Sequence, residues 1–287
     1  MSKEYIIQKA VEVGKVVKPR RLLPDQYGER FMAFRKYDGC CAVLKDGQTF
    51  SRTGESYQCL DDVAKYLHQR APDFVFIGEA WWPGKDQFNL ISGAFRRQQT
   101  NDDLFLMLHD VIPKSDFDYG STFMPFLERA YIADELDGVM DDRIQSAKGF
   151  GYLGSWAAVQ AKCNEIVDEG GYDGLVLRDP NGLWKAGSGT TGEIIKVKRK
   201  LSFDLRVLEV NTAIGEKTGR AVYKLVVDFR GSRLGVGSGL PHDAALVPAV
   251  GDIVEVEAMD YSSNGLLRLL REPRFKGIRF DKTEPDV

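Results

Sequence analysis

The pattern of apolar and polar residues in this 287-residue sequence changes near residue 201, and that change constrains the fold more than any other feature. Before it, apolar runs of strand length alternate with runs of helical periodicity. After it come short apolar runs, separated by polar or glycine-containing turns, such as "DLRVLEVN", "AVYKLVVDF" and "DIVEVEAM". Strands of this kind are typical of a small β-barrel, for which an OB-fold is a natural candidate. We therefore predict two domains, residues 1–201 and 202–287.

The first domain carries the signals of a mixed α+β structure. Asp46-Gly47 predicts a hairpin turn within residues 40–51, because this pair accepts positive backbone angles. Apolar residues at helical spacing predict helices over 58–70, 122–137 and 156–168, the last with Ser155 as its N-cap. Buried strands are predicted at 74–80, 104–112, 172–178 and 193–200.

Composition and charge exclude several classes of protein. The net charge of −3 excludes a uniformly basic nucleic-acid coat, so any polyanion must bind local basic patches. No apolar run reaches the length of a transmembrane helix, and charges interrupt the amino terminus where a signal peptide would be apolar. The four cysteines include no Cys-x-x-Cys pair, so neither a zinc site nor a disulfide framework is indicated. We predict a cytoplasmic protein, of bacterial or phage-infected host cytoplasm, without a membrane partner.

Charged residues interrupt several of the apolar runs. Lys36 lies in "FRKYDGCCAV", Glu79 in "FIGEA" and Asp173 at the start of "YDGLVLR". A buried charge must be paired, bound to a metal or neutralised. A partly desolvated lysine loses its proton more readily, so Lys36 is a candidate nucleophile that Asp38 could orient. Taken alone, Lys36 is better explained as a surface lysine whose stem packs on a strand.

Further cations favour the functional interpretation of Lys36. Lys196 and Lys198 are two residues apart, so on a strand both point to one face. Arg52 directly follows the predicted hairpin and could bind a hydroxyl or a phosphate. Lysines that converge with an acid pair suit a metal-bound polyphosphate.

Five short motifs carry a resemblance to a known superfamily. In chain order they are Lys36-Tyr37-Asp38-Gly39, Ser51-Arg52, Gly78-Glu79, Asp173-Gly174 and Lys196-Val197-Lys198. They resemble the motifs of covalent nucleotidyltransferases, which comprise ATP-dependent DNA ligases, RNA ligases and mRNA capping enzymes. Residues 87–97, 173–180 and 265–282 are also similar to small bacteriophage ATP-dependent DNA ligases. The resemblance implies an α+β fold, in which two antiparallel sheets with flanking helices form a nucleotide cleft and an OB-fold domain follows.

The resemblance also implies a reaction and the residues that perform it. Lys36 would attack the α-phosphate of ATP to form lysyl-AMP, AMP would pass to the 5′-phosphate at a nick, and the 3′-hydroxyl would displace it. The implied catalytic residues are Lys36, Asp38, Lys196 and Lys198. Mg²⁺ or Mn²⁺ would bind Asp173 and Glu79. The residues implied to bind the nucleotide are Phe34, Arg35, Arg52, Glu79, His109, Lys196, Lys198, Arg279 and Lys282.

The carboxy-terminal stretch Arg279-Phe280-Asp281-Lys282 resembles the last motif of the superfamily. In the family this Arg-x-Asp-Lys motif contacts the ATP pyrophosphate when the OB domain closes. The resemblance therefore implies a hinge, which we place near residues 199–203.

The chain departs from the family pattern at four positions. Asp173 stands where glutamate is usual, which shifts a metal ligand by about one methylene. Cys41 stands where many members have arginine, and strand alternation predicts that it faces away from Lys36 and serves packing. His109 occupies the place of an aromatic residue that stacks on adenine. Phe34 stands where phage relatives often have an acidic residue near the adenine amine.

The expected partner is nicked duplex DNA, bound by a monomer through backbone and shape rather than base sequence. Each neutralised phosphate adds a salt-dependent share of affinity. The predicted DNA contacts are Arg52, Arg96, Arg97, Lys200, Arg268, Arg271, Arg274 and Lys276.

Other functions fit part of the pattern. An RNA ligase is disfavoured because several of those enzymes have a helical carboxy-terminal domain, and NAD⁺ as donor because those ligases resemble longer chains with zinc modules. A capping guanylyltransferase shares the OB domain and the last motif, so the motifs alone leave it open. A nick-binding module that has lost catalysis would explain the departures at Cys41 and Asp173. Retention of Lys36, Glu79 and both later lysines favours an enzyme.

Overall fold

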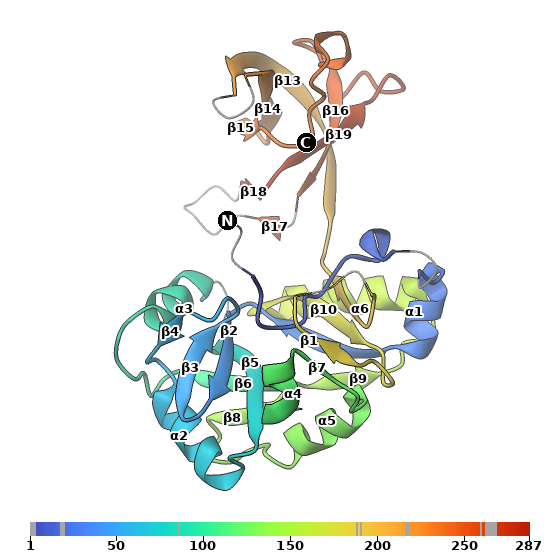
Figure 1. The fold of residues 1–287 in the computed structure, drawn as a ribbon. Coiled ribbons are helices and arrows are strands. Elements are labelled where there is room, and N and C mark those ends of the chain that lie inside the picture. The colour runs from blue at the N-terminus through green and yellow to red at the C-terminus, as the bar shows by residue number, and fades with distance from the viewer. Residues whose placement is uncertain are drawn as a thin grey trace. The chain divides into compact units, whose positions relative to one another are not determined.

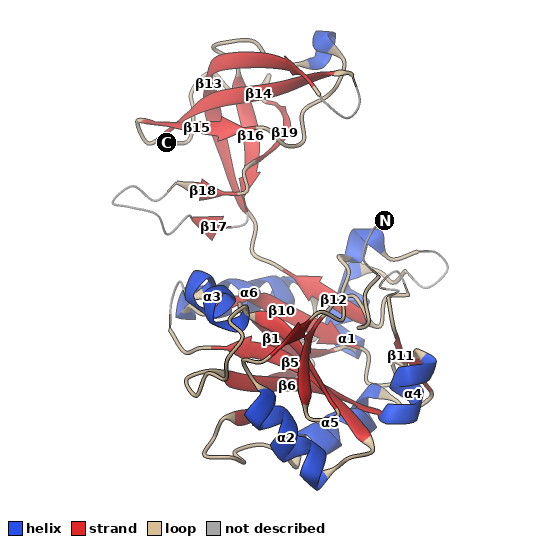
Figure 2. Cartoon of the chain, turned by 60° about the vertical axis from the view of Figure 1, so that its left-hand side comes forward, coloured by secondary structure: helices blue, strands red, loops and turns tan. Residues whose placement is uncertain are grey.

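The chain divides into two compact units, Met1–Lys198 and Arg199–Val287 (Figure 1). The structure is a computed structural model, and it describes residues 4–17, 21–84, 87–187, 189, 191–215, 219–258, 260–261 and 269–287. No helix in these ranges is long and apolar enough to cross a membrane. Figure 2 shows that α-helices occur in the first unit, whereas the second is built almost entirely of strands.

The first unit contains two main sheets. One has the strand order β12-β10-β1-β9 and the other β4-β3-β2-β5-β6-β8. The strands of the first sheet are β1 (Met32–Tyr37), β9 (Gly149–Gly151), β10 (Tyr172–Arg178) and β12 (Ile194–Val197). Those of the second are β2 (Cys40–Lys45), β3 (Gln48–Ser51), β4 (Ser56–Tyr57), β5 (Phe74–Trp81), β6 (Phe105–Pro113) and β8 (Ile144–Ser146). All neighbours pair antiparallel except β6 and β8, which are parallel, so the expectation of wholly antiparallel sheets is wrong at this edge.

Helices flank the two sheets. They are α1 (Pro24–Arg30), α2 (Asp61–Arg70), α3 (Phe88–Phe95), α4 (Lys114–Tyr119), α5 (Phe126–Asp134) and α6 (Trp156–Glu169), with a short 3₁₀ turn at Val13–Lys15. The predicted helix over 156–168 is confirmed as α6, and Ser155 Oγ accepts a hydrogen bond from Ala158 N at 3.2 Å. A small sheet joins β7 (Ser121–Thr122) to β11 (Trp184–Lys185).

Some predicted boundaries are wrong. The helix predicted over 122–137 is shorter, because β7 takes its first residue and α5 begins only after Pro125, which has no N–H to continue a helix inward. The strand predicted over 193–200 ends at Val197. The hairpin is confirmed: β2 and β3 pair antiparallel, and Asp46 and Gly47 both have positive φ angles.

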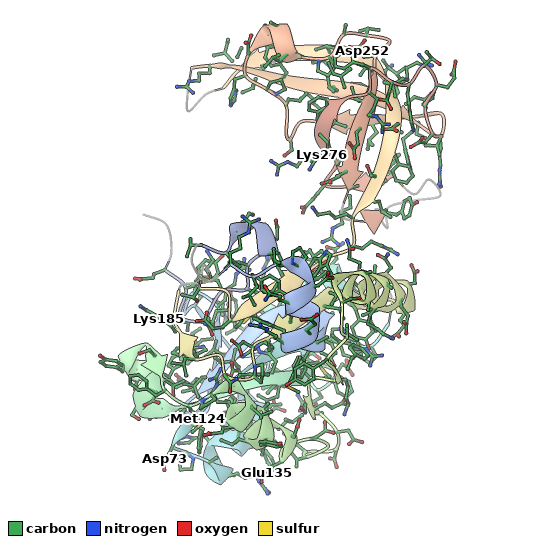
Figure 3. The ribbon with its side chains drawn as sticks, turned by 90° about the vertical axis from the view of Figure 1, so that its right-hand side faces the viewer. Asp73, Met124, Glu135, Lys185, Asp252 and Lys276 are labelled. Carbon is green, nitrogen blue, oxygen red and sulfur yellow. The ribbon has the colours of Figure 1, made fainter. Side chains whose placement is uncertain are left out.

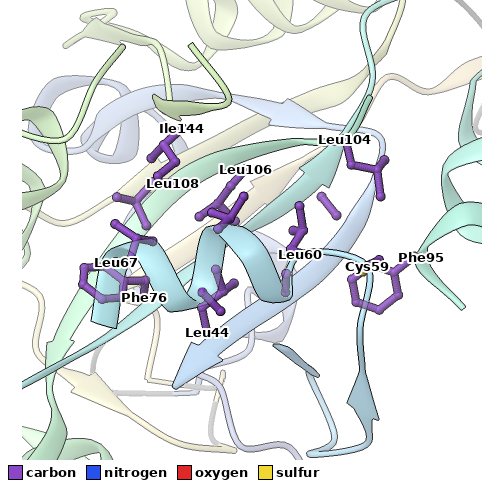
Figure 4. Close-up of a cluster of buried hydrophobic side chains, with 14 of the residues drawn as sticks. Leu44, Cys59, Leu60, Leu67, Phe76, Phe95, Leu104, Leu106, Leu108 and Ile144 are labelled. Carbon is purple, nitrogen blue, oxygen red and sulfur yellow. The ribbon is translucent and has the colours of Figure 1, made fainter. Parts of the chain in front are cut away.

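Each sheet buries its helix-covered face in a separate core. Between the six-stranded sheet and α2 lie Leu44, Leu60, Leu67, Phe76 and Leu106, all at most 2% exposed (Figure 4). The four-stranded sheet packs Ala33, Leu175, Leu177 and Ile195 against Val159 and Ile166 of α6. The opposite face of the six-stranded sheet carries a smaller apolar cluster, in which Phe117 of α4 packs with Ile77, Ile112 and Trp184.

The second unit is a five-stranded antiparallel sheet of order β15-β14-β13-β16-β19. Its strands are β13 (Leu201–Ile214), β14 (Ala221–Phe229), β15 (Ser232–Val236), β16 (Ile253–Ala258) and β19 (Arg274–Ile278), and a smaller pair joins β17 (Asp260–Tyr261) to β18 (Leu270–Arg271). A single 3₁₀ turn lies at Ala244–Leu246. The chain after β15 reaches the other edge, because Ser238 bridges Arg274 and Phe275 N donates to Ser238 O at 2.9 Å.

Candidate functional site

Lys36, Asp173 and Lys198 form an ion-paired cluster on the four-stranded sheet. Asp173 Oδ2 lies 2.8 Å from Lys36 Nζ and 2.6 Å from Lys198 Nζ, so one carboxylate oxygen holds both ammonium groups. All three side chains are mostly buried, and Asp173 is 19% exposed. Burial by itself raises the pKa of the Asp173 carboxyl. The charges of Lys36 and Lys198 lower that pKa by more than burial raises it, so it lies below the ordinary value.

Gly174 explains how Asp173 reaches the lysines. Simple alternation along β10 would place Asp173 on the core side with Leu175 and Leu177. Gly174 instead has a φ angle of +123°, and the β1–β10 register shifts after Lys36. A Cβ atom at Gly174 would lie 2.2 Å from Val197 O, so no other residue fits. The glycine therefore turns the carboxylate toward Lys36.

The protonation state of Lys36 differs from the expectation. Burial lowers the pKa of Lys36, but the charges of Asp173, Glu79 and Asp38 outweigh burial, so its pKa lies above the ordinary value. The prediction that partial desolvation makes Lys36 lose its proton more readily is wrong, because the carboxylates around it outweigh burial. Lys36 is an ammonium at neutral pH and must lose a proton before it can attack.

Glu79 brings the second sheet to this cluster. Burial raises its pKa to about 7, the charge of Lys36 opposes that rise, and the charges of Asp38 and Asp173 add to it. Gly39 allows the approach: a Cβ atom there would lie 2.3 Å from Ala80 O and 2.8 Å from Glu79 Cγ. The glycine of the Lys-x-Asp-Gly motif is thus required by the close approach of the β1–β2 connection to the backbone of β5.

Cys41 lies on the site side of β2, which corrects the expectation that it faces away from Lys36. Cys41 pairs with Glu79 across the β2–β5 ladder and packs on the same face as Ile77. Burial raises the pKa of its thiol, and the charge of Glu79 raises that pKa further. The expectation failed because β1 and β2 belong to different sheets, so alternation cannot be counted through Asp38 and Gly39.

Lys196 lies near the cluster and pairs with a residue that the sequence did not single out. Its Nζ is 3.9 Å from Glu12 Oε1. Burial lowers the pKa of Lys196, Glu12 opposes this, and Lys198 lowers the pKa further. Arg52 follows β3 and is exposed, and its charge is close enough to lower the pKa of Glu79.

Phe34 and His109 border a buried ionic network. Phe34 packs edge-to-face on Phe126, whose ring lies 4.0 Å from the Arg178 guanidinium carbon. Burial lowers the pKa of His109 to about 4, and the charge of Arg178 lowers it too, so the imidazole is neutral. His109 Nδ1 is buried without a hydrogen-bond partner among the described residues. Such an atom can accept or donate one bond to a ligand.

The network itself could not be assembled from the sequence. Asp110 Oδ1 accepts from Arg129 Nε at 2.7 Å, and Asp110 Oδ2 accepts from Arg178 Nη2. All three side chains are buried. One signal was available, because a charged residue inside the apolar run of β6 requires a buried partner. The apolar run does not show that the partners are Arg129 and Arg178, which lie 19 and 68 residues away in the chain.

Several predicted residues lie apart from the cluster. Arg35 points to the helix-covered face of β1, where Nη2 lies 2.9 Å from Glu169 Oε2 and the guanidinium stacks near Phe150 and Tyr172. Arg96 and Arg97 are exposed just after α3. In the structure Arg35 is therefore on the side of the sheet opposite Lys36.

The other predicted DNA contacts belong to the second unit. Lys276, labelled in Figure 3, lies on β19 with Nζ 3.2 Å from Glu257, and Lys200 approaches the same carboxylate at 3.7 Å. Arg271 and Arg274 are exposed on β18 and β19. Arg268 lies outside the described residues.

Arg279 and Lys282 form a second cluster around one aspartate. Asp204 is 5% exposed at its side chain and accepts from Arg279 Nη1 at 2.7 Å, while Lys282 pairs with the same oxygen. Asp281 also pairs with Arg279, whose hydrogen bond to the carboxylate is the main reason that the pKa of Asp281 falls to about 2. Asp286 Oδ1 lies 2.9 Å from Lys282 Nζ. Both cations therefore have carboxylate partners within their own unit.

The predicted metal ligands supply part of a coordination shell. No group of three metal-ligating side chains occurs in the part of the chain that the structure describes. Asp173 and Glu79 are two carboxylates that approach one site from different sheets. Mg²⁺ commonly binds one or two carboxylates and completes its shell with water and substrate phosphate oxygens. The donor set fits such an ion when phosphate is present.

Comparisons with known proteins place this geometry in context. No family model matches the sequence, and no curated protein matches it. Solved structures do match. A chain named Pmar-Lig_Pre matches with a TM-score of 0.73 and 19% identity, over 97% of this chain and 68% of that one. A Lig E DNA ligase matches with a TM-score of 0.71 and 19% identity, over 95% of this chain and 98% of that one. The ATP-dependent DNA ligase of bacteriophage T7, in complex with ATP, matches with a TM-score of 0.56 and 17% identity over 97% and 100%. The chain shares the fold of DNA ligases.

Proposed function

We propose that the protein is an ATP-dependent DNA ligase that seals nicks through a lysyl-AMP intermediate. The observation that carries the proposal is the cluster at Lys36: a buried lysine held by Asp173 beside Lys198, with Glu79 from the other sheet. The shared fold supports it. Residues 1–201 would be the adenylyltransferase domain and residues 202–287 an OB-fold domain, for which the sheet order and the Ser238–Arg274 bridge are the support.

In the first step, the Lys36 ammonium loses a proton to solvent and Nζ attacks the α-phosphorus of ATP. A P–N bond forms, the P–O bond to pyrophosphate breaks, and a second proton leaves Nζ to solvent. Asp173 orients Nζ from 2.8 Å. Lys196 and Lys198 lie where they can bind the α-phosphate and stabilise charge on its oxygens. Bound Mg²⁺ would neutralise the carboxylates of Asp173 and Glu79, which removes the reason for the raised pKa of Lys36, and would polarise the phosphate.

In the later steps the nucleotide leaves Lys36. An oxygen of the 5′-phosphate attacks the α-phosphorus, the P–N bond breaks, and Lys36 Nζ takes up a proton from solvent and leaves as the amine. The 3′-hydroxyl then attacks the 5′-phosphorus, loses its proton and displaces AMP. His109 and Phe34 are proposed to contact the base, with the neutral imidazole of His109 offering Nδ1 to it.

The second unit contributes to ATP binding in this proposal. Arg279 and Lys282 would contact pyrophosphate when the units close, and each would have to exchange Asp204 for phosphate. Arg52, Lys200, Arg271, Arg274 and Lys276 are proposed DNA contacts. A monomer suffices for every step.

The test is intact mass after incubation with Mg²⁺ and ATP, GTP or NAD⁺ in separate reactions. We expect one AMP adduct from ATP and none in Lys36→Ala, after a control measurement shows that neither protein was purified already adenylylated. A GMP adduct would move the function to capping. If the protein forms an AMP adduct but seals only RNA ends, it is an RNA ligase. If it forms no adduct from any donor but binds nicks tightly, it is a binding module.

A further inference from the structure

The amino-terminal segment of the first unit joins the two sheets beside the Lys36 site. Ile6 N donates to Arg52 O at 3.0 Å, next to β3 of the six-stranded sheet. Val11 N donates to Ile194 O at 3.1 Å and Val11 O accepts from Lys196 N at 2.9 Å, both on β12 of the other sheet. In Figure 1 this segment is the dark blue ribbon nearest the N label. The main chain of residues 5–11 is therefore fixed at both ends.

The side chains of this segment gather two cations around one aromatic ring. Lys9 Nζ lies 4.4 Å from the centroid of the Tyr5 ring, and the Arg52 guanidinium carbon lies 5.3 Å from the same centroid. Each cation is attracted by the ring's negative face. Within the described ranges neither Lys9 nor Arg52 forms an ion pair with a carboxylate. Two cations held against one ring attract an anion.

The position of Arg52 links this group to the proposed chemistry. Ser51, the residue before Arg52, pairs with Ala42 of β2, and the neighbouring Cys41 of β2 pairs with Glu79. Arg52 therefore follows the strand next to the one that pairs with Glu79. An anion bound by Lys9 and Arg52 would then adjoin the reacting phosphate. Nucleic-acid backbone phosphate is the anion that the proposed substrate offers beside its nick.

We propose that Tyr5, Lys9 and Arg52 form a phosphate-binding cluster, the Tyr5 cluster, that contacts a strand of nicked DNA beside the nick. Lys9 is a direct phosphate contact. Tyr5 is a positioning residue that holds Lys9 and Arg52 through its ring, while the Ile6–Arg52 hydrogen bond fixes the main chain. This inference rests on the proposed function, since it takes the same DNA as ligand.

The experiment measures binding of the full chain to a 5′-phosphorylated nicked duplex over a series of KCl concentrations. The variants are Lys9→Ala, Tyr5→Leu and Tyr5→Phe. Lys65→Ala is the matched control, because Lys65 is an exposed lysine on α2 outside the site. Thermal unfolding of each variant checks that it is folded.

Loss of one phosphate contact changes the salt dependence in a defined way. We expect Lys9→Ala to reduce the slope of log K against log salt by about 0.9, the share of one phosphate on B-DNA. Tyr5→Leu should weaken binding by about 3- to 30-fold, as expected for lost cation–π contacts, while Tyr5→Phe keeps the ring and should restore the affinity. Lys65→Ala should match the wild type in slope and affinity.

Two results would overturn the inference. One is a Lys9→Ala slope equal to that of Lys65→Ala, and the other is an equal loss in Tyr5→Leu and Tyr5→Phe. Mass and sealing assays on the same wild-type preparation separate this inference from the proposed function. A wild type that binds nicked DNA but forms no AMP adduct refutes the ligase, whereas a wild type that seals nicks while Lys9→Ala keeps the full slope refutes only the Tyr5 cluster.

Discussion

The two units each contain one aspartate that holds two cations, and the two clusters differ in their surroundings. In the first unit Asp173 pairs with Lys36 and Lys198, and in the second Asp204 pairs with Arg279 and Lys282. Around Asp204 the main chain adds hydrogen bonds, since Asp204 N donates to Asp286 Oδ2 and Asp286 N to Asp204 O, each at 2.8 Å. Hydrogen bonds from Asp204 N and Lys282 keep the pKa of Asp286 low.

Around Asp173 a further ionisable group joins the ion pairs. Glu79 adds a buried carboxyl whose pKa, raised by burial to about 7, lies in the physiological range. Its charge state therefore responds to any cation or phosphate that enters. The comparison teaches that the same ion-pair pattern can stabilise a fold or prepare a reaction, depending on whether a neighbouring group titrates near neutral pH.

The largest effect is expected from Asp173→Asn. It removes the charge that orients both lysines and would bind the metal, so the rate of AMP-adduct formation should fall by about 100- to 1,000-fold. Intact mass against time gives the rate. Asp173→Glu keeps the charge and should retain or raise the activity. If Asp173→Asn adenylylates at the wild-type rate, the Asp173 cluster has no role in the reaction.

A second prediction tests the backbone packing that brings Glu79 to the Asp173 cluster. A Cβ atom in Gly39→Ala would clash with Ala80 O, and the variant should lose about 3 kcal/mol of unfolding free energy. Urea denaturation followed by tryptophan fluorescence reports this unit, because all four tryptophans lie in it.

Gly93→Ala on α3 is the control for that substitution. A Cβ atom at Gly93 would have no heavy atom within 4 Å beyond its own helix backbone and chain neighbours, so alanine should stabilise the helix by about 0.5–1 kcal/mol. Equal effects at the two glycines would contradict the close approach of Gly39 to β5.

The third prediction concerns pH. The folded state holds the pKa of Glu79 at about 7, above its ordinary value of 4.5, because burial disfavours the charge. The folded state then binds more protons than the unfolded state between these pH values, so this group lowers stability as pH rises from 4.5 to 7. The shift corresponds to about 3 kcal/mol, which partial contact with water reduces to about 2 kcal/mol.

Glu79→Gln removes that pH-dependent cost. The variant should be more stable than the wild type at pH 8, by about 2 kcal/mol, and the difference should shrink toward pH 4.5. Denaturation at several pH values measures it, and the same variant should adenylylate more slowly. A pH-independent difference would show that Glu79 does not titrate in this window.

The smallest effect is expected in the second cluster. Asp204→Asn weakens charge-assisted bonds to Arg279 and Lys282, but both cations are partly exposed and can turn to water, so the loss should be about 1–2 kcal/mol. Because the second unit contains no tryptophan, the loss of stability is measured by hydrogen exchange of peptides from β13. Asp281→Asn, at an exposed carboxylate, should leave that exchange nearly unchanged. If Asp281→Asn reduces stability more than Asp204→Asn does, Asp281 rather than Asp204 is the main carboxylate partner of the two cations.

Much of the first unit could be predicted from sequence because its signals are local. Asp46-Gly47 specifies the turn between β2 and β3, and Ser155 specifies the start of α6. Helix α3 was not predicted, since its eight residues are too short for a clear periodicity. The pairing of β6 with β8 was also missed, because a three-residue strand carries little pattern of its own.

By itself the sequence determined the order of the motifs and the change from a mixed α/β pattern to a β-rich pattern, because both depend only on residues close together in the chain. Only the tertiary structure decided which charges meet: Asp173 turns to Lys36 through Gly174, and Cys41 faces the site because β2 joins a different sheet from β1. It also decided that Lys36 is protonated before ligand binds. Periodicity is a property of a segment, whereas a side chain's partners and its pKa depend on residues far away in the chain, which only packing brings together.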